Sequence, residues 1–228
     1  MKFRAISRPT ILVLAALACG GGAQSSRNSQ ASAPAPAQSS APRAAPGALR
    51  RYAALKVMLF PLQGVRGEAL PSWKVASAGD TTVTRGADRA FEEVLGERGL
   101  GKQWIFPHDM QRSARRNPTY VSDPYDLRAG DAIRYAIRKR DEPLGEPFAS
   151  QLRALAGVSD SRYAIIPIEL RFEPAGTMGR AILRVAAVDS RGAQVVWVGE
   201  VVGDDAAAYS PAVLATISQR FADLVVPR

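Results

Sequence analysis

The chain has 228 residues, 46% of them hydrophobic and 22% charged, and its 30 Lys and Arg residues outnumber its 21 Asp and Glu residues to give a formal net charge of +9 at pH 7. A single cysteine and a single histidine exclude a disulfide framework and multi-histidine metal sites. The length suits one domain with a sizeable core.

The first 18 residues have the pattern of an export signal. Lys2, Arg4 and Arg8 precede the apolar run Ile11–Ala18, which is far shorter than the roughly 20 residues that span a bilayer as a helix. Removal of this segment takes away three basic residues and lowers the formal net charge from +9 to +6. Because an exported chain leaves the cytoplasm, nucleic acid is not expected as a partner.

The junction Ala16-Leu17-Ala18-Cys19 resembles the lipobox of bacterial lipoproteins. In that family the signal is cleaved just before the cysteine, so the resemblance implies that Cys19 carries a lipid and holds the chain on a membrane. The family prefers leucine where this chain has Ala16, and an ordinary signal peptide with an incidental cysteine is the alternative. Gly20 stands where many inner-membrane lipoproteins have aspartate, which implies the outer membrane, facing the periplasm.

Residues 19–50 are predicted to form the lipidated cysteine and a disordered tether. Gly20–Arg50 is rich in Gly, Ser, Gln, Ala and Pro, and it has almost no bulky apolar residue with which to offset the entropy of ordering. A flexible coil of this length spans about 30 Å root-mean-square. A single globular α/β domain is therefore expected at residues 51–228.

Apolar runs and glycines define the first elements of this domain. The run Leu55–Leu62, followed by Gly64, predicts a buried strand. Apolar residues at helical spacing predict a helix over Ala87–Arg98 that ends at Gly99. Gln103–Phe106 is expected to be a second short strand.

The middle segment, His108–Gly145, is polar and interrupted by prolines. Short helices are expected at Met110–Arg116 and Asp131–Arg140, the first ended by Asn117-Pro118 because the residue before a proline disfavours the helical region. A further helix is predicted from Phe148 to about Gly157.

Three strands and a helix follow in close order. The strands are predicted at Tyr163–Phe172, Ala181–Val188 and Gln194–Val202, with the turn Asp189–Gly192 joining the last two as a hairpin. Ser210-Pro211 begins the final helix with a capping hydroxyl and a proline. This order predicts an α/β fold, a two-layer sandwich in which helices pack on a mixed sheet of about five strands.

Three stretches, VMLFPL, SDSRYAIIPIEL and LRVAAVDSRGAQVVWVGEVVG, resemble the periplasmic α/β domains of the TolB amino-terminal and CsgG-like types. The matching positions of the last stretch are Asp189, Gly192, Val195, Val196 and Trp197. The resemblance implies a non-catalytic envelope domain that works by protein contact or assembly. The residues themselves favour a turn at Asp189 and Gly192 and a packing role for Trp197.

Catalytic patterns are weak, and neither a metal nor a cofactor is predicted. His108 has no Gly-x-Ser-x-Gly motif to accompany it and is interpreted as a residue at the start of a helix. Adjacent carboxylates such as Glu92-Glu93 and Asp204-Asp205 point to different sides of an element, so they seldom form the facing pair of a glycosidase. A carboxylate-dependent hydrolase of envelope polymers and a secretion or ring-forming subunit stay open as alternatives.

Arginines interleaved with tyrosines distinguish the 108–145 segment. They are Arg112, Arg115 and Arg116 on the first predicted helix, Arg134 and Arg138 on the second, and Tyr120, Tyr125 and Tyr135 between them. Such groups suit contact with phosphate or sugar, although a charge run is also typical of a solvated helix face. We predict that these five arginines bind an anionic partner, and that the chain is a lipid-anchored, non-catalytic binding or assembly module with a protein partner in the envelope.

Overall fold

The sheet and its helices lie in the part of the chain that follows the predicted tether. The computed structural model describes residues 41–73, 81–139 and 142–228. The predicted export signal, Cys19 and the tether up to residue 40 lie outside the described residues and stay predictions. None of the helices in the described ranges combines the length and the apolar composition needed to cross a membrane.

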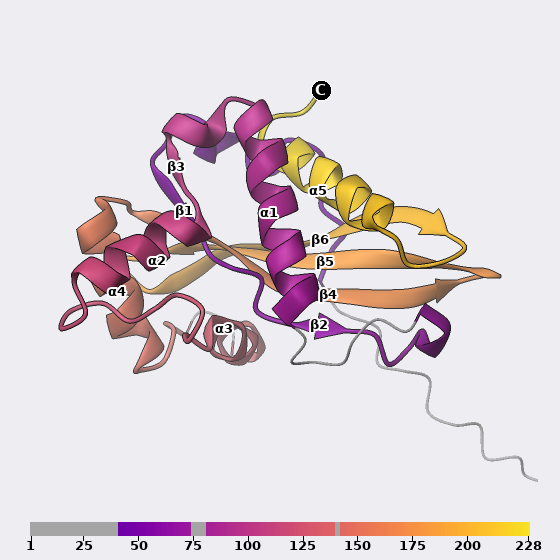
Figure 1. The fold of residues 1–228 in the computed structure, drawn as a ribbon. Coiled ribbons are helices and arrows are strands. Elements are labelled where there is room, and N and C mark those ends of the chain that lie inside the picture. Colours follow the sequence, from indigo (N-terminus) through magenta and orange to yellow (C-terminus); the bar gives the residue numbers. More distant parts are fainter. Residues whose placement is uncertain (1–40, 74–80, 140–141) are drawn as a thin grey trace, which may run out of the picture. The chain divides into compact units, whose positions relative to one another are not determined.

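Six strands of the described residues form one mixed sheet (Figure 1). They are β1 (Val57–Leu59), β2 (Val65–Arg66), β3 (Trp104–Ile105), β4 (Tyr163–Ala175), β5 (Met178–Asp189) and β6 (Gln194–Ala206). The order is β3-β1-β4-β5-β6, with β1 parallel to both neighbours and the last two strands antiparallel. Strand β2, which was not predicted, pairs in parallel with β4 beyond a register shift at Pro167 and Glu169.

Five α-helices accompany the sheet in the described ranges. They are α1 (Thr81–Glu97), α2 (Pro107–Arg116), α3 (Ala129–Arg138), α4 (Phe148–Ser159) and α5 (Pro211–Val225). Each predicted helix is present, and α1, α2 and α3 begin earlier than expected. Gly99, in the left-handed region with φ 84°, follows α1 as predicted.

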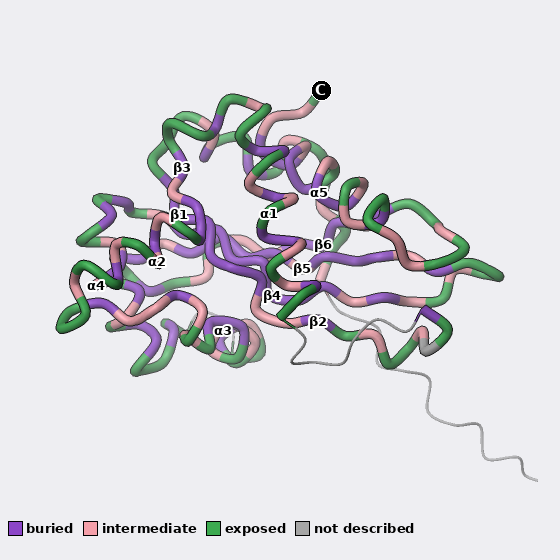
Figure 2. Tube along the Cα trace, in the orientation of Figure 1, coloured by how far each residue is buried: buried purple, intermediate pink, exposed green. Residues whose placement is uncertain are grey.

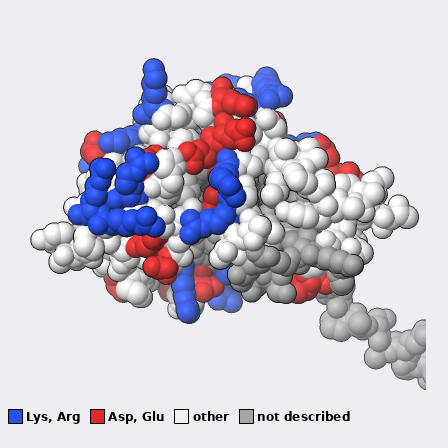
Figure 3. Space-filling view, viewed as in Figure 1, with Lys and Arg blue, Asp and Glu red and all other residues white. Residues whose placement is uncertain are grey.

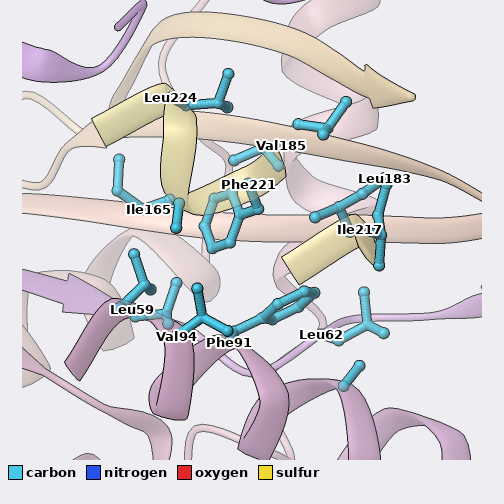
Figure 4. Packing of buried hydrophobic residues seen from close by; sticks show 14 of the residues in the cluster. Leu59, Leu62, Phe91, Val94, Ile165, Leu183, Val185, Ile217, Phe221 and Leu224 are labelled. Atoms are coloured by element: carbon cyan, nitrogen blue, oxygen red, sulfur yellow. The ribbon is translucent and has the colours of Figure 1, made fainter. Parts of the chain in front are cut away.

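One face of the sheet packs against α1 and α5. Phe91 of α1 and Phe221 of α5 meet edge to face, with ring centroids 5.1 Å apart, and both are buried together with Leu183 and Val185 of β5 (Figure 4). Burial of such aromatic and aliphatic side chains supplies the main favourable term for this half of the fold.

The opposite face packs against α2, α3 and α4. Met58 and the adjoining Phe60 point to this side, where they are buried with Ile133 of α3 and Leu152 of α4. The Phe60 and Phe148 rings are 6.2 Å apart in an edge-to-face contact. Figure 2 shows buried residues concentrated along the central strands, between these two sets of helices.

The expectation of helices packed on a mixed α/β sheet is confirmed, but the helices occupy both faces, so the arrangement has three layers instead of the two expected. The reason lies in β1, whose successive residues are all buried and alternate between the two clusters. A continuous apolar run of this kind is typical of a strand that is covered on both sides.

Residues 42–49, which their composition places in the tether, are part of the folded unit. Arg43 forms a parallel bridge with Glu200 at the edge of β6, where the Ala44 N–H donates to the Glu200 carbonyl at 2.8 Å. The Leu49 N–H donates to the Leu224 carbonyl at 2.8 Å, and the Leu49 side chain is fully buried. Backbone pairing at a sheet edge needs no particular side chain, so a low-complexity composition did not reveal this contact.

Buried charges on β4 and β6 are paired. The Arg171 guanidinium donates two hydrogen bonds, at 3.0 and 2.9 Å, to the carboxylate of Glu200, which is 7% exposed. Glu169 forms ion pairs with Arg66, whose Nε is 2.8 Å away, and with Arg134, a guanidinium nitrogen of which is 3.6 Å away. These pairs connect β4 to β6 across β5, and they connect β4 to β2 and to α3.

Substitution Arg171→Ala is expected to lower the free energy of unfolding by about 3 kcal/mol or more, because Glu200 loses a two-point partner while its carboxylate stays buried. Urea denaturation of the chain without its first 19 residues measures this loss. The exposed pair of Lys56 and Asp160 serves as the control, and Lys56→Ala is expected to cost less than about 1 kcal/mol. Equal losses in the two variants would contradict the assignment.

Candidate functional site

A groove of about 640 Å³ lies between α3 and the start of α4. Its apolar lining comes from Leu127, Ala132, Tyr135, Pro147 and Phe148. Phe148 is buried and anchors α4 in the core, whereas Tyr135 is 48% exposed and forms an open wall. A concave, mostly apolar surface with a few polar groups is the usual form of a binding site.

Acidic side chains surround this groove. Asp126, Asp131 and Glu146 line it together with one basic residue, Arg128. Glu146 accepts a hydrogen bond from the Ser150 N–H at 3.0 Å, and hydrogen bonds from Ser150 hold the pKa of this carboxyl below its usual value. Asp131 and Glu146 are already ion-paired within the domain, with Arg134 at 2.7 Å and with Arg153 at 3.3 Å, whereas Asp126 makes no ion pair in the described ranges.

A second hollow of about 290 Å³ adjoins the groove and shares residues 126–128 and Asp131 with it. It reaches Gln63, whose side-chain carbonyl accepts from the Gly130 N–H at 3.3 Å. A Cβ atom on Gly130 would lie 3.0 Å from the Gln63 Cβ, so glycine allows α3 to approach the β1–β2 connection this closely. The position of α3, and with it one wall of the groove, depends on this contact.

Asp88 of α1 fixes the backbone at Leu62, a residue that lines the second hollow. It is 5% exposed, and its Oδ1 accepts from the Leu62 N–H at 2.8 Å, whereas its Oδ2 has no hydrogen-bond partner among the described residues. Burial raises the pKa of this carboxyl to about 6. Tyr125 lies beside it with a pKa raised to about 12, chiefly by burial and also by the charge of Asp88, and the Arg85 guanidinium stacks 3.6 Å from the Tyr125 ring centre.

Asp88 is not among the residues predicted from the sequence, because the carboxylates considered there were adjacent pairs. The available signal was its spacing, since Asp88 lies three residues before Phe91 and seven before Leu95, on the apolar stripe of the helix. A carboxylate at such a position is buried by the packing of its neighbours.

The five predicted arginines lie on two helices that pack on different elements. Arg112, Arg115 and Arg116 project from α2, whose Met110 and Ala114 face the core; α2 packs on α4 and β1, whereas α3 packs on β4 and β6. Figure 3 shows Lys and Arg side chains gathered over the position of α2.

On α3, Arg134 pairs with Asp131 at 2.7 Å and faces Glu169, while Arg138 is exposed. Arg134 thus serves the folded structure through these ion pairs. The three arginines of α2 are the ones that present their charge to solvent together.

Other residues singled out from the sequence have structural surroundings. His108, near the start of α2, lies between Glu92, 2.9 Å from its Nδ1, and Asp109, 3.2 Å from its Nε2. Trp197 packs on the α1 and α5 side of the sheet, where its ring covers Gly199. In the hairpin turn it is Ala193, with φ 49°, that adopts the left-handed conformation next to Gly192.

No family model matches this chain, and no curated protein matches it. Solved structures give low-scoring likenesses. Lipoprotein GNA1162 from Neisseria meningitidis is 14% identical, with 70% of this chain and 90% of that chain covered and a TM-score of 0.36. The LpoB C-terminal domain from Escherichia coli is 10% identical, with 67% and 84% covered and a TM-score of 0.34. A PelC dodecamer from Paraburkholderia phytofirmans is 11% identical, with 82% and 96% covered and a TM-score of 0.34.

Likenesses with TM-scores of 0.34 to 0.36 do not establish a function for this chain. The resemblance to the TolB amino-terminal and CsgG-like types stays a prediction from the sequence. Function has to be argued from the groove and from the surfaces around it.

The substitution Asp88→Asn is expected to stabilise the protein at pH 7.5 by about 1 kcal/mol. The amide oxygen can still accept from the Leu62 N–H and no charge is buried, but the amide NH2 group takes the buried Oδ2 position, where no hydrogen-bond partner lies among the described residues. A carboxyl whose folded pKa is raised from 3.8 to about 6 binds more protons when folded, so its contribution to stability falls as pH rises through that window.

Chemical denaturation of both proteins between pH 4 and pH 7.5 measures the difference. The gap between them is expected to widen up to about pH 6 and to stay constant above it. A variant less stable than the parent at pH 7.5 would show that the charged form of Asp88 supports the fold.

Proposed function

We propose that this protein is a lipid-anchored, non-catalytic module of the bacterial envelope that binds a partner protein in the groove between α3 and α4. The lipobox-like residues before Cys19 and the composition of the tether support the anchor. Gly20 supports attachment to the outer membrane, with the folded unit in the periplasm. A tether of this kind leaves the folded unit free to reach a partner near the membrane.

The apolar groove with an acidic rim is the observation that carries the proposed binding activity. A large apolar side chain of the partner would fill the space beside Tyr135 and Phe148, as anchor residues do in protein interfaces. Asp126 at the rim, which makes no ion pair among the described residues, favours Lys or Arg next to that anchor, because complementary charge speeds association and selects the partner. The expected ligand is thus a protein segment that combines an apolar anchor with basic flanks.

Electrostatics at the groove favour binding over hydrolysis. A carboxylate pair that cleaves glycosides needs one member with a raised pKa to act as the acid. Glu146, which lines the groove, has a lowered pKa, and Asp88, whose pKa is raised, does not line it and is held by the Leu62 N–H. This distribution supports a recognition site.

Metabolic labelling with a fatty-acid analogue tests the anchor. The protein is expected to take up the label, and Cys19→Ala is expected to remove it, because this cysteine is the only one in the chain. Retention of the label by the variant, or an unmodified thiol in the purified native protein, would contradict lipid attachment at this residue.

A photocrosslinking amino acid in place of Tyr135 tests the groove in intact cells. We expect one defined adduct with an envelope protein, because this side chain is 48% exposed at the wall of the site. The additional substitution Ala132→Trp fills the groove and is expected to reduce the adduct at least tenfold.

The matched control places the same crosslinker at Ala215, an exposed position of α5 on the other side of the sheet. The groove proposal fails if Ala215 gives the same adduct as Tyr135, or if the adduct persists when the groove is filled. Circular dichroism of each variant verifies that the fold is retained.

A further inference from the structure

Helix α2 presents a basic face that the proposed function does not use. Arg112, Arg115 and Arg116 are spaced by three and four residues, so they lie on one side of the helix, opposite the buried Met110 and Ala114. Arg112 is 3.6 Å from Asp109, and no ion pair occurs for Arg115 or Arg116 within the described ranges. This face therefore carries net positive charge toward solvent.

An exposed aromatic residue follows directly. Tyr120 is 77% exposed, the highest value among the exposed large hydrophobic residues, and its N–H donates to the Asn117 carbonyl at 3.0 Å, in the turn that ends α2. The turn fixes the backbone of this tyrosine next to the arginines. Tyrosine has an apolar ring and a polar hydroxyl, and it is enriched where one end of a side chain is in an apolar layer and the other in water.

We propose that the α2 face, defined as Arg112, Arg115, Arg116 and Tyr120, docks on anionic phospholipid headgroups. Guanidinium groups bind phosphate oxygens through two parallel hydrogen bonds, which suits phosphodiester headgroups. The tyrosine ring enters the boundary between headgroups and acyl chains. The choice of a membrane as the occupant rests on the proposed lipid anchor, because that anchor keeps a lipid surface within reach of this face.

The expected strength fits reversible docking. Each arginine close to an anionic leaflet strengthens binding about fivefold, so the three together contribute about a hundredfold. Such a contact is weak for a free protein. The predicted tether, roughly 20 residues between Cys19 and the described part of the chain, would raise the effective concentration of the domain at its own membrane to about the millimolar range, where a weak contact is populated.

Docking would also orient the groove. Helices α2, α3 and α4 cover the same face of the sheet, so contact of α2 with the headgroups places the α3–α4 groove on the membrane side of the domain. A partner embedded in the same membrane would then meet the groove without a long extramembrane segment. Salt weakens the docking contact, because exposed charges are screened within a Debye length of about 10 Å at 0.1 M.

Cosedimentation with vesicles tests the proposal on residues 20–228, which retain every described contact and carry no lipid. Vesicles of phosphatidylcholine with 30% phosphatidylglycerol are compared with pure phosphatidylcholine, at low and high salt. We expect binding to the anionic vesicles alone, and a loss of at least about tenfold at 0.3 M salt. Because the protein in this test is not acylated and no partner is present, the result does not depend on Cys19 or on the groove.

Charge reversal of the face gives the decisive comparison. The triple variant Arg112→Glu, Arg115→Glu and Arg116→Glu is expected to bind at least about fiftyfold more weakly, and Tyr120→Ala about threefold more weakly. The matched control reverses the same number of charges at exposed positions elsewhere, with Arg50→Glu, Lys102→Glu and Arg191→Glu. It is expected to lose less than about fivefold.

Equal losses in the two triple variants would overturn the proposal, since net charge and not the α2 face would then govern binding. Unchanged binding of the α2 variant would overturn it as well. Tighter binding to polyglutamate than to the anionic vesicles would assign the face to an acidic protein instead of a membrane. Thermal unfolding of each variant establishes that the fold is intact.

Discussion

Burial of β4 on both faces is the constraint on which the rest of the structure depends. Residues 164–168 of this strand are all buried, and Ala164, Ile165 and Ile166 belong alternately to the two hydrophobic clusters. A strand that has no solvent-exposed face requires a helical layer on each side of the sheet. The second layer, made by α2, α3 and α4, is what creates the groove, because α3 and α4 leave an apolar hollow where they diverge.

Charged residues inside the fold set where this second layer lies. Asp88 holds the Leu62 N–H on one side of α3, and Glu169 on β4 pairs with Arg134 of α3 itself. Buried charges are costly to desolvate, and they are tolerated where their partners are well placed. These contacts pair the charge of Arg134 with carboxylates, so among the predicted arginines it is the three on α2 that together present their charge to solvent.

Local patterns were sufficient to predict most elements. The hairpin of β5 and β6 followed from alternating apolar residues around Asp189–Gly192, and the helices followed from their stripes and from Ser210-Pro211. Strand β2 was not predicted from the sequence, because the two residues between Gly64 and Gly67 are too few to show a periodicity. The pairing of Val65 with Leu170 is seen only in the folded structure. The second helical layer was not predicted because α2 is polar on average and only Pro107, Met110 and Ala114 mark its buried side.

The groove could not be predicted from the sequence for a related reason. Its lining comes from the α3 region and from residues 145–151, and nothing in the local pattern places Tyr135 opposite Pro147 across a hollow. The arginines, in contrast, were visible as a run, but the sequence could not distinguish Arg134, which pairs with Glu169, from Arg115, which faces solvent. Ion-pair partners that are distant in the sequence determine which arginines expose an unpaired charge to solvent.

We propose that the layer of α2, α3 and α4 is where this protein contacts the membrane and its partner. Hydrogen–deuterium exchange of the anchored protein in native membranes, compared with purified residues 20–228, tests this most directly. Slower exchange in residues 107–120, 126–139 and 142–151, with α5 unchanged, is the predicted result. Identical exchange in both samples, or protection confined to α5, would contradict it.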